Sequence, residues 1–202
     1  MINIGVLAST KATDLQAIID AIISKKLNAR ISVVVSNKKG AFALERARKH
    51  DIKAVFIDAQ GKERGAYDKE VASELDKNKV DLVLLIGYMR ILSPWFVRKY
   101  KNRIMNIHPS LLPAFAGGMD KDVHHEVLKH GCKVTGCTLH FVDESVDSGP
   151  IIMQKAVEID ENETAGSLKE KVQKAEQEII LKAIQLFEKG KIMIEGKRVM
   201  IK

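Results

Sequence analysis

Cysteine, proline and aromatic residues are all scarce in this chain of 202 residues. The only two cysteines, Cys132 and Cys137, have a spacing that matches neither a zinc motif nor a redox pair, so we expect reduced thiols in or near the core. Aromatic side chains make up 5% of the residues, which leaves few platforms for stacking nucleic-acid bases. No apolar run approaches the roughly 20 residues that cross a bilayer. The sequence therefore favours a globular protein that uses neither nucleic acid nor a membrane.

The amino-terminal residues also lack the features of a signal peptide. Residues 1–8 have no basic segment and too short an apolar segment, so they are interpreted as a first strand, and a cytoplasmic location is expected. Thirty-three Lys and Arg against 26 Asp and Glu give a net charge of +7, which attracts anionic ligands such as phosphates. Because the lysines are scattered through amphipathic segments, they indicate a solvated surface rather than a groove for nucleic acid.

Apolar, β-branched runs alternate with helical periodicity in the first half of the chain. The pattern predicts strands at 4–8, 31–36, 54–57 and 80–86, and helices at 15–25, 41–49 and 67–78. This alternation is typical of βαβ winding, and near-continuous Val, Ile and Leu runs predict strands buried on both faces. We therefore expect an α/β fold with a Rossmann-like, doubly wound, mostly parallel sheet flanked by helices.

The order of elements changes after residue 102. The sequence predicts a strand at 104–108, a helix at 123–129, strands at 134–142 and 150–159, a C-terminal helix at 165–188, and a β-hairpin at 191–201 turning at Glu195-Gly196. Ser93 and Pro94 are the expected N-cap and first residue of a further helix. Without a linker or an internal repeat, residues 1–202 are expected to form a single domain with two halves, 1–100 and 101–202.

The run from Asn106 to Pro113 is the strongest candidate for an active site. Side chains alternate along a strand, so Asn106 and His108 project to the same side. Pro109 ends the strand and leaves the imidazole at the carboxyl edge of the sheet, where ligands bind in open α/β folds. The alternative is a strand-end histidine that only satisfies a backbone group.

Three further loops follow strands and could complete such a site. The acidic turn from Asp143 to Pro150 either is solvated or holds a functional carboxylate. The segment 9–14 precedes a helix, where βα turns bind phosphate, although Thr13 or Asp14 could simply cap the helix. The segment 87–94 suits a flat, partly polar ligand. The four prolines, at positions 94, 109, 113 and 150, all lie in these loops, which suits a rigid site.

The histidines at 124, 125 and 130 do not form a zinc motif. Their spacing is HExxxH, so His125 and His130 lie about 140° apart on a helix and cannot share an ion. No metal is expected, and an amphipathic helix with exposed histidines is the simpler interpretation, except at His124.

Three segments, 87–94, 106–113 and 140–151, together resemble the folate-dependent formyltransferases over nearly the whole chain, and most closely those that act on glycinamide ribonucleotide. The resemblance implies transfer of a formyl group from 10-formyltetrahydrofolate to the amino group of glycinamide ribonucleotide in de novo purine biosynthesis. It implies small-molecule partners only, a monomer or homodimer, and no metal. Residues 1–100 would form a phosphate or nucleotide half, and residues 101–202 a catalytic and folate-binding half.

The resemblance also implies roles for individual residues. The catalytic residues would be Asn106, His108 and Asp147. The folate would be bound by Met89, Arg90, Ile91, Leu92, Val142, Asp143 and Glu144, together with Arg64 on the side of the acceptor substrate. The acceptor would be bound by Thr10, Lys11, Ala12, Thr13, Asp14, Gln173 and Glu176.

The residue types suit this chemistry. Attack of an amine on the formyl group creates an oxyanion, which the Asn106 amide and a protonated His108 could stabilise. Asp147 could hold the imidazole in place and accept protons from the attacking ammonium through water.

Two departures from the family pattern bear on the substrate. The family's phosphate loop carries glycines followed by Ser and Asn, whereas this chain has Ala12, Thr13 and Asp14. A positive φ at Ala12 would cost about 1 kcal/mol, and an Asp14 carboxylate would oppose a phosphate unless it turned away. Lys11 could compensate. Residues 115–124 also lack the usual Pro-Gly and His pattern, although His124 could take the histidine's place.

Rival functions remain open from the sequence. A formyltetrahydrofolate hydrolase shares the three catalytic residues but normally adds a regulatory amino-terminal domain. Formyltransferases that act on another amine, such as methionyl-tRNA or an amino sugar, tend to be longer. A folate-binding module without catalysis would explain the altered phosphate loop but has no need for the catalytic residues.

Overall fold

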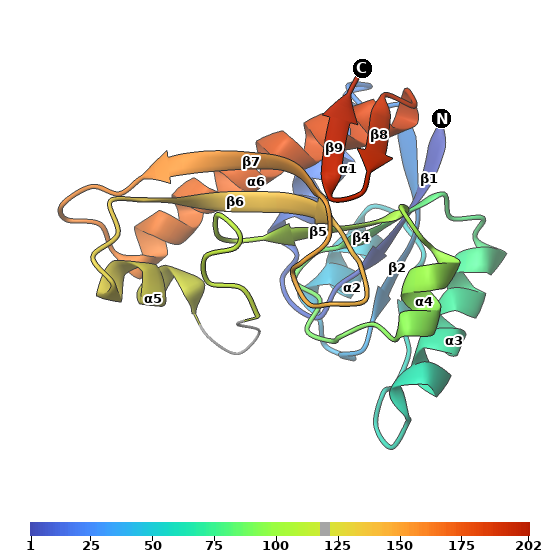
Figure 1. Ribbon diagram of the computed structural model, residues 1–202. Coiled ribbons are helices and arrows are strands. Elements are labelled where there is room, and N and C mark those ends of the chain that lie inside the picture. The colour runs from blue at the N-terminus through green and yellow to red at the C-terminus, as the bar shows by residue number, and fades with distance from the viewer. Residues whose placement is uncertain (118–121) are drawn as a thin grey trace.

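A seven-stranded sheet extends through the protein in the order β3-β2-β1-β4-β5-β6-β7 (Figure 1). The computed structural model describes residues 1–117 and 122–202. The first five strands are parallel: β1 (Ile2–Leu7), β2 (Ala29–Ser36), β3 (Ala54–Phe56), β4 (Leu82–Leu85) and β5 (Ile104–His108). The antiparallel pairs β5–β6 and β6–β7 then add β6 (Val134–Phe141) and β7 (Ile151–Glu158).

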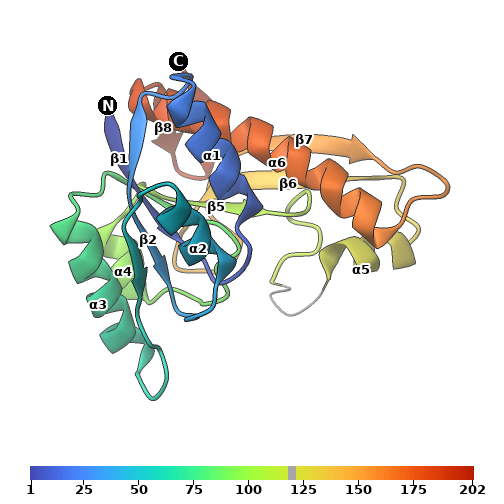
Figure 2. The same cartoon turned by 180° about the vertical axis from the view of Figure 1, so that it is seen from behind.

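Helices cover both faces of this sheet (Figures 1 and 2). One face is covered by α1 (Thr13–Ile23), α2 (Phe42–Lys49), α5 (Val123–Lys129) and α6 (Ala165–Glu188), whose apolar side chains join one core cluster. The other face is covered by α3 (Arg64–Lys77) and α4 (Pro94–Lys99), which join a second cluster. The doubly wound, mostly parallel α/β fold expected from the sequence is therefore confirmed, with both faces of β1 and β4 buried.

Element boundaries differ from the predictions by a few residues. Helix α3 begins at Arg64 rather than Tyr67, and α1 begins at Thr13 rather than Leu15. Strand β4 begins at Leu82 rather than Val80, because the Val80 N–H donates to the Leu75 carbonyl and so closes α3. At α4, the Ser93 side chain accepts from the Phe96 N–H at 3.3 Å, which confirms the predicted cap.

A hairpin of β8 (Ile192–Glu195) and β9 (Arg198–Ile201) follows α6, as predicted. The amino-terminal nitrogen lies 3.5 Å from the Glu188 carboxylate at the end of α6, and the Lys202 N–H donates to the Lys191 carbonyl at 2.9 Å. Both termini consequently lie beside the end of α6, as Figure 1 shows. Of the helices that the structure describes, none has the length and apolar character of a membrane span.

Candidate active site

Two neighbouring antiparallel strands and the turn after them bring four polar side chains together. Asn106 and His108 lie at the carboxyl end of β5, and the strand register sets Asn106 opposite His140 of β6. The β6–β7 turn then contributes Asp147. The structure thus brings together Asn106, His108 and Asp147, the three residues expected to be catalytic, and adds His140, which the sequence analysis did not include.

His108 and Asp147 form the central contact of this group. His108 Nδ1 lies 3.4 Å from Asp147 Oδ2, and both side chains are about nine-tenths buried. The Gly117 N–H donates to the same carboxylate oxygen at 2.9 Å. His108 Nε2 lies 3.1 Å from the Phe115 carbonyl, which can only accept, so Nε2 carries a hydrogen. Both ring nitrogens of His108 therefore face oxygen acceptors.

His140 fixes the orientation of the Asn106 amide. Its Nδ1 lies 2.8 Å from the Phe141 carbonyl and so carries a hydrogen, which leaves Nε2 as the acceptor in the neutral ring. Asn106 Nδ2 lies 3.2 Å from that Nε2 and donates one of its two hydrogens to it. Burial lowers the pKa of His140, against opposing contributions from the Phe141 carbonyl and from Asp147, and so favours the neutral ring. The second hydrogen of the amide remains for a ligand.

A tightly built turn between β6 and β7 positions Asp147, whose own φ is 51°. Gly149 leaves no room for a side chain, because an added Cβ would lie 1.7 Å from the Phe141 carbonyl oxygen. Asp143 accepts from the Ser145 N–H at 3.1 Å and from the Ser148 hydroxyl at 2.7 Å. These contacts lie within the turn itself, so local sequence sets much of its shape.

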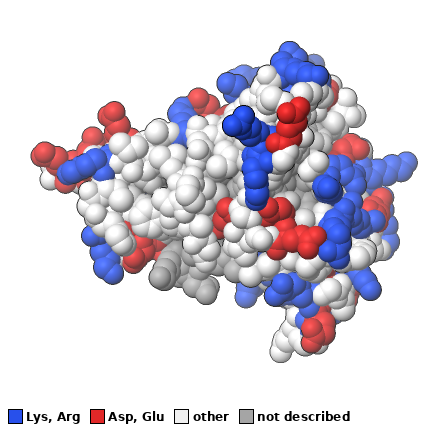
Figure 3. Space-filling view, in the orientation of Figure 1, with Lys and Arg blue, Asp and Glu red and all other residues white. Residues whose placement is uncertain are grey.

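Two cations from other elements hold the same turn. Lys197, in the turn between β8 and β9, lies 3.0 Å from Asp143 and also donates to the Ser148 carbonyl, and Arg98 of α4 lies 3.0 Å from Glu144. Figure 3 shows acidic side chains gathered near the middle of this face with basic ones beside them. Burial alone would raise the pKa of Asp143, but hydrogen bonds from Ser148 and Lys197 outweigh it and lower the pKa. Both carboxylates expected to contact folate are thus paired within the protein.

The segment after β5 is tied to β6 and β7. The Thr138 hydroxyl donates to the Ser110 carbonyl at 2.7 Å and accepts from the Leu112 N–H at 3.0 Å. Gln154 of β7 donates to the Leu112 carbonyl at 2.9 Å. These bonds fix the path that brings the Phe115 carbonyl to His108.

The segment from Gly87 to Pro94 lies against the β1–α1 loop. The Met89 N–H donates to the Ser9 hydroxyl at 2.8 Å, and a Cβ at Gly87, where φ is 58°, would lie 2.2 Å from Thr10 Oγ1. Met89 and Ile91 are exposed, as a ligand-binding surface requires. The Leu92 side chain, by contrast, is buried and packs in the core cluster with α3 and α4.

Arg90 is held over an aromatic ring. Its guanidinium carbon lies 4.4 Å from the centroid of the Tyr67 ring of α3, and the buried Nε has no hydrogen-bond partner among the residues that the structure describes. Val142 lies next to the turn, partly buried, and its N–H donates to the Ile104 carbonyl at 3.0 Å. Val142 also packs against the core cluster that contains Leu92.

The segment expected to bind the acceptor leads into α1. Thr10 and Lys11 are exposed, Thr13 is partly buried as the first residue of α1, and Ala12 adopts the left-handed conformation with φ 46° that the sequence analysis considered costly. Asp14 does turn away from solvent, with 4% of its surface exposed. On α6, Gln173 is partly buried and Glu176 is buried near Asp14. The structure thus brings the two parts of the expected acceptor site together.

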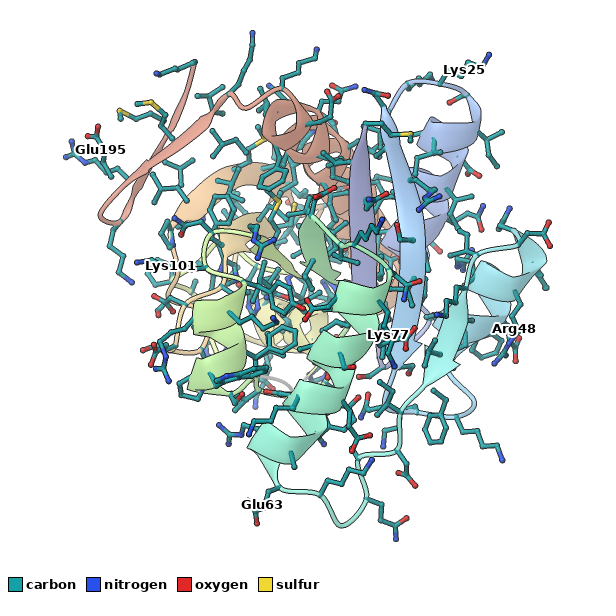
Figure 4. The ribbon with its side chains drawn as sticks, turned by 90° about the vertical axis from the view of Figure 1, so that its right-hand side faces the viewer. Lys25, Arg48, Glu63, Lys77, Lys101 and Glu195 are labelled. Carbon is teal, nitrogen blue, oxygen red and sulfur yellow. The ribbon has the colours of Figure 1, made fainter. Side chains whose placement is uncertain are left out.

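Arg64 stands apart from these groups. It is exposed and begins α3, and in the described part of the chain no hydrogen bond or ion pair links it to Asn106, His108 or Asp147. Figure 4 shows its neighbour Glu63 at the outer end of α3, far from Lys77 at the other end.

The other histidines differ in exposure. His124 of α5 is buried, and burial lowers its pKa, whereas His125 and His130 are exposed. Within residues 1–117 and 122–202, no three His, Cys, Asp or Glu side chains are grouped as a metal site. Positions 118–121 of the atypical segment 115–124 lie outside the described residues.

The chemistry of the site follows from these contacts. An amide hydrogen and an imidazole lie together at a strand end, where such donors can stabilise a developing oxyanion, and the adjacent carboxylate can accept a proton. Such a set suits attack on a carbonyl-like carbon.

Comparisons with known proteins agree with this geometry. A family model described as formyl transferase matches residues 2–184. The chain is 40% identical to a phosphoribosylglycinamide formyltransferase of Escherichia coli, with 94% of this chain and 89% of that protein covered. It also matches trifunctional purine biosynthetic proteins. The chain spans only 14% of the length of the one from Chironomus tentans and 19% of the length of the one from Bos taurus.

Two solved structures extend the comparison. A glycinamide ribonucleotide transformylase from Symbiobacterium toebii has a TM-score of 0.94 and 44% identity, with 100% of this chain and 94% of that chain covered. A formyltetrahydrofolate deformylase from Pseudomonas syringae has a TM-score of 0.90 at 25% identity, with 99% of this chain and 65% of that chain covered. From its fold, its site and these matches, the chain belongs to the formyl transferase family.

Proposed function

We propose that this protein transfers a formyl group from 10-formyltetrahydrofolate to the amino group of glycinamide ribonucleotide. The observation that carries the proposal is the contact of His108 with Asp147 beside Asn106, in a chain 40% identical to a phosphoribosylglycinamide formyltransferase. The product is N-formylglycinamide ribonucleotide, and the activity belongs to de novo purine biosynthesis.

The catalytic residues would act on a tetrahedral intermediate. A bond forms between the acceptor nitrogen and the formyl carbon, and the bond from that carbon to N10 of the folate breaks. The free hydrogen of Asn106 Nδ2 and the protonated His108 stabilise the oxyanion in between. Overall, one proton moves from the amine to N10, and Asp147 carries it through water.

The two substrates would occupy opposite sides of the catalytic residues. The folate is bound by Met89 to Leu92 and by the turn residues Val142, Asp143 and Glu144, together with Arg64 on the side of the acceptor substrate. The acceptor is bound by Thr10 to Asp14, with Gln173 and Glu176 of α6 facing its ribose and phosphate. Residues 1–100 thus supply the phosphate loop, Arg64 and Met89 to Leu92, whereas residues 101–202 supply the catalytic residues, the folate-binding turn and the two residues of α6.

Further assignments accompany this function. We infer a cytoplasmic enzyme with small-molecule substrates and no nucleic-acid partner, as a monomer or homodimer. The two free cysteines, Cys132 and Cys137, support this location, and the name of the E. coli relative supports the small-molecule substrates.

The direct test is to follow loss of 10-formyltetrahydrofolate spectroscopically with and without glycinamide ribonucleotide. We expect deformylation only when the ribonucleotide is present, with the formylated ribonucleotide as product. Loss of the formyl group without the ribonucleotide would instead identify a hydrolase, the activity named for the Pseudomonas syringae structure. Folate binding with no reaction would contradict both activities.

Two substitutions test the catalytic assignment. We expect His108→Ala and Asp147→Asn each to lower kcat by at least about two orders of magnitude, because each removes a group that acts in the transition state. His125→Ala is a matched control, since His125 is exposed on α5. Circular dichroism should show an unchanged fold in all three variants, and near-normal turnover by either of the first two would refute the assignment.

A further inference from the structure

Two buried carboxyl groups lie on α1 and α6, which pack against each other. Asp14 is the second residue of α1 and is 4% exposed, and Glu176 of α6 is 7% exposed. Asp14 Oδ1 is buried and has no hydrogen-bond partner among the described residues. A buried carboxylate oxygen without a donor is costly, so the position calls for a proton or a ligand.

Few positive charges offset this pair. Among the residues that the structure describes, the basic group that lowers the pKa of Glu176 is Lys169, an exposed residue two turns earlier on α6. The Gln177 side chain lowers the pKa of Asp14 by hydrogen bonding, and Cys137 of β6 is a neutral thiol whose own pKa is raised to about 12. His124 of α5, which also faces Lys169, is kept neutral by burial.

Two carboxyl groups in such a place cannot both ionise readily. Burial raises the pKa of Asp14 to about 6, and burial together with the charge of Asp14 raises the pKa of Glu176 well above its usual value. Ionisation of one carboxyl group of the pair therefore disfavours ionisation of the other.

The pair also borders the expected acceptor site. Ala12 and Thr13 precede Asp14 at the amino end of α1, whose first N–H groups have no acceptor within the helix and so favour an anion. Gln173 and Glu176 are three residues apart and lie on one face of α6. A phosphate at the end of α1 would thus lie close to the charge of the pair.

We propose that Asp14 and Glu176 share one proton and that this proton sets the affinity for the phosphorylated acceptor. With the proton bound, the pair carries one negative charge and leaves an acceptor site that admits a phosphate. Without it, two negative charges repel the phosphate. Asp14 is thereby a specificity-determining residue, and this inference rests on the proposed function.

The first half of the test needs no substrate. Asp14→Asn keeps the shape of the side chain but cannot ionise, and Asp20→Asn makes the same change at an exposed position of the same helix. We expect the Tm of Asp14→Asn, relative to the unaltered protein, to rise by about 3 °C or more between pH 5 and pH 8. The Asp20→Asn difference should stay constant over this range.

The second half measures the KM for glycinamide ribonucleotide at the same pH values. We expect the ratio of the KM of the unaltered protein to that of Asp14→Asn to grow at least about fivefold from pH 6 to pH 8.5. The comparison removes the titration of the substrate phosphate, which is common to both proteins. The KM for the folate should change by less than about twofold, because Asp14 lies on the acceptor side.

The outcomes separate this inference from the proposed function. A Tm difference that is independent of pH would overturn proton sharing. A pH-dependent Tm difference with a constant KM ratio would overturn the link to the acceptor, although the transferase activity would stand. No turnover of the ribonucleotide by any of the proteins would overturn the proposed function, and the acceptor half of the inference with it.

Discussion

At the scale of single residues, the hydrogen position on the buried His140 ring determines the orientation of the Asn106 side-chain amide. His140 gives its Nδ1 hydrogen to the Phe141 carbonyl and receives an Asn106 hydrogen at Nε2. If Asn106 were rotated by 180°, its carbonyl oxygen would face the lone pair of Nε2, which is unfavourable. His140 is thus a positioning residue for Asn106.

Replacement of His140 by Phe tests this role, because Phe fills most of the space but accepts no hydrogen bond. We expect kcat to fall about tenfold, since the amide loses its fixed direction. In an Asn106→Ala background, the same substitution should have little further effect on kcat, as a double-mutant cycle requires for residues that act together. Equal losses in both backgrounds would show that His140 acts independently of Asn106.

Only part of this residue-scale picture can be predicted from the sequence. Strand alternation places Asn106 and His108 on one side, and the adjoining prolines mark the end of the strand. The role of His140 depends on the register between β5 and β6, which pairs residues 34 positions apart. The inward turn of Asp14 depends on the packing of α1 against α6, which local sequence does not specify.

At the scale of elements, the β6–β7 turn matters because it carries Asp147 back to His108. Its shape depends on the close approach of Gly149 to the Phe141 carbonyl. That obstacle is backbone, so no nearby side chain could move to relieve it. The Gly149-Pro150 pair predicted a tight turn from the sequence. The contacts of Lys197 and Arg98 with this turn come from distant elements, so they could not be predicted.

Gly149→Ala should therefore displace the turn. We expect kcat to fall at least about tenfold and the free energy of unfolding to fall by about 1–3 kcal/mol, because Asp147 moves and the strand ends are strained. Gly166→Ala is the matched control, since an added Cβ in the first turn of α6 would lie 3.8 Å from Thr164 Oγ1. That control should retain kcat and stability or gain slightly in stability, and equal behaviour of both variants in kinetics and urea unfolding would contradict the argument.

At the scale of the whole molecule, buried ionisable groups make stability depend on pH in two opposite ways. Burial lowers the pKa of His124 and His140, so their contribution to stability is present above the unfolded value of about 6.5 and is lost as the pH falls below it. The raised pKa values of Asp14 and Glu176 have the opposite effect, because their contribution to stability is present at low pH and is lost as the pH rises. For Asp14 this loss occurs as the pH passes through about 6. The overall fold followed from the alternation of strands and helices, whereas these opposing dependences follow from tertiary burial.

The acid side of this dependence can be tested at His124. We expect the Tm of His124→Asn, relative to the unaltered protein, to rise by about 2 °C or more as the pH is lowered from 7.5 to 5, because Asn has no proton to take up on unfolding. His125→Asn, at an exposed neighbouring position, should show a constant difference in the same thermal scans. A constant difference for His124→Asn as well would show that burial of this ring does not affect its titration.

The position of the two chain termini has a consequence for fused proteins. Both termini lie beside the end of α6, whereas the catalytic side chains lie at the carboxyl end of β5 and in the β6–β7 turn. A neighbouring domain joined to either terminus would be attached beside α6 rather than at the strand ends that carry the chemistry. This arrangement allows such a fold to be a segment of a larger polypeptide, as in the trifunctional relatives, without obstruction of its substrates.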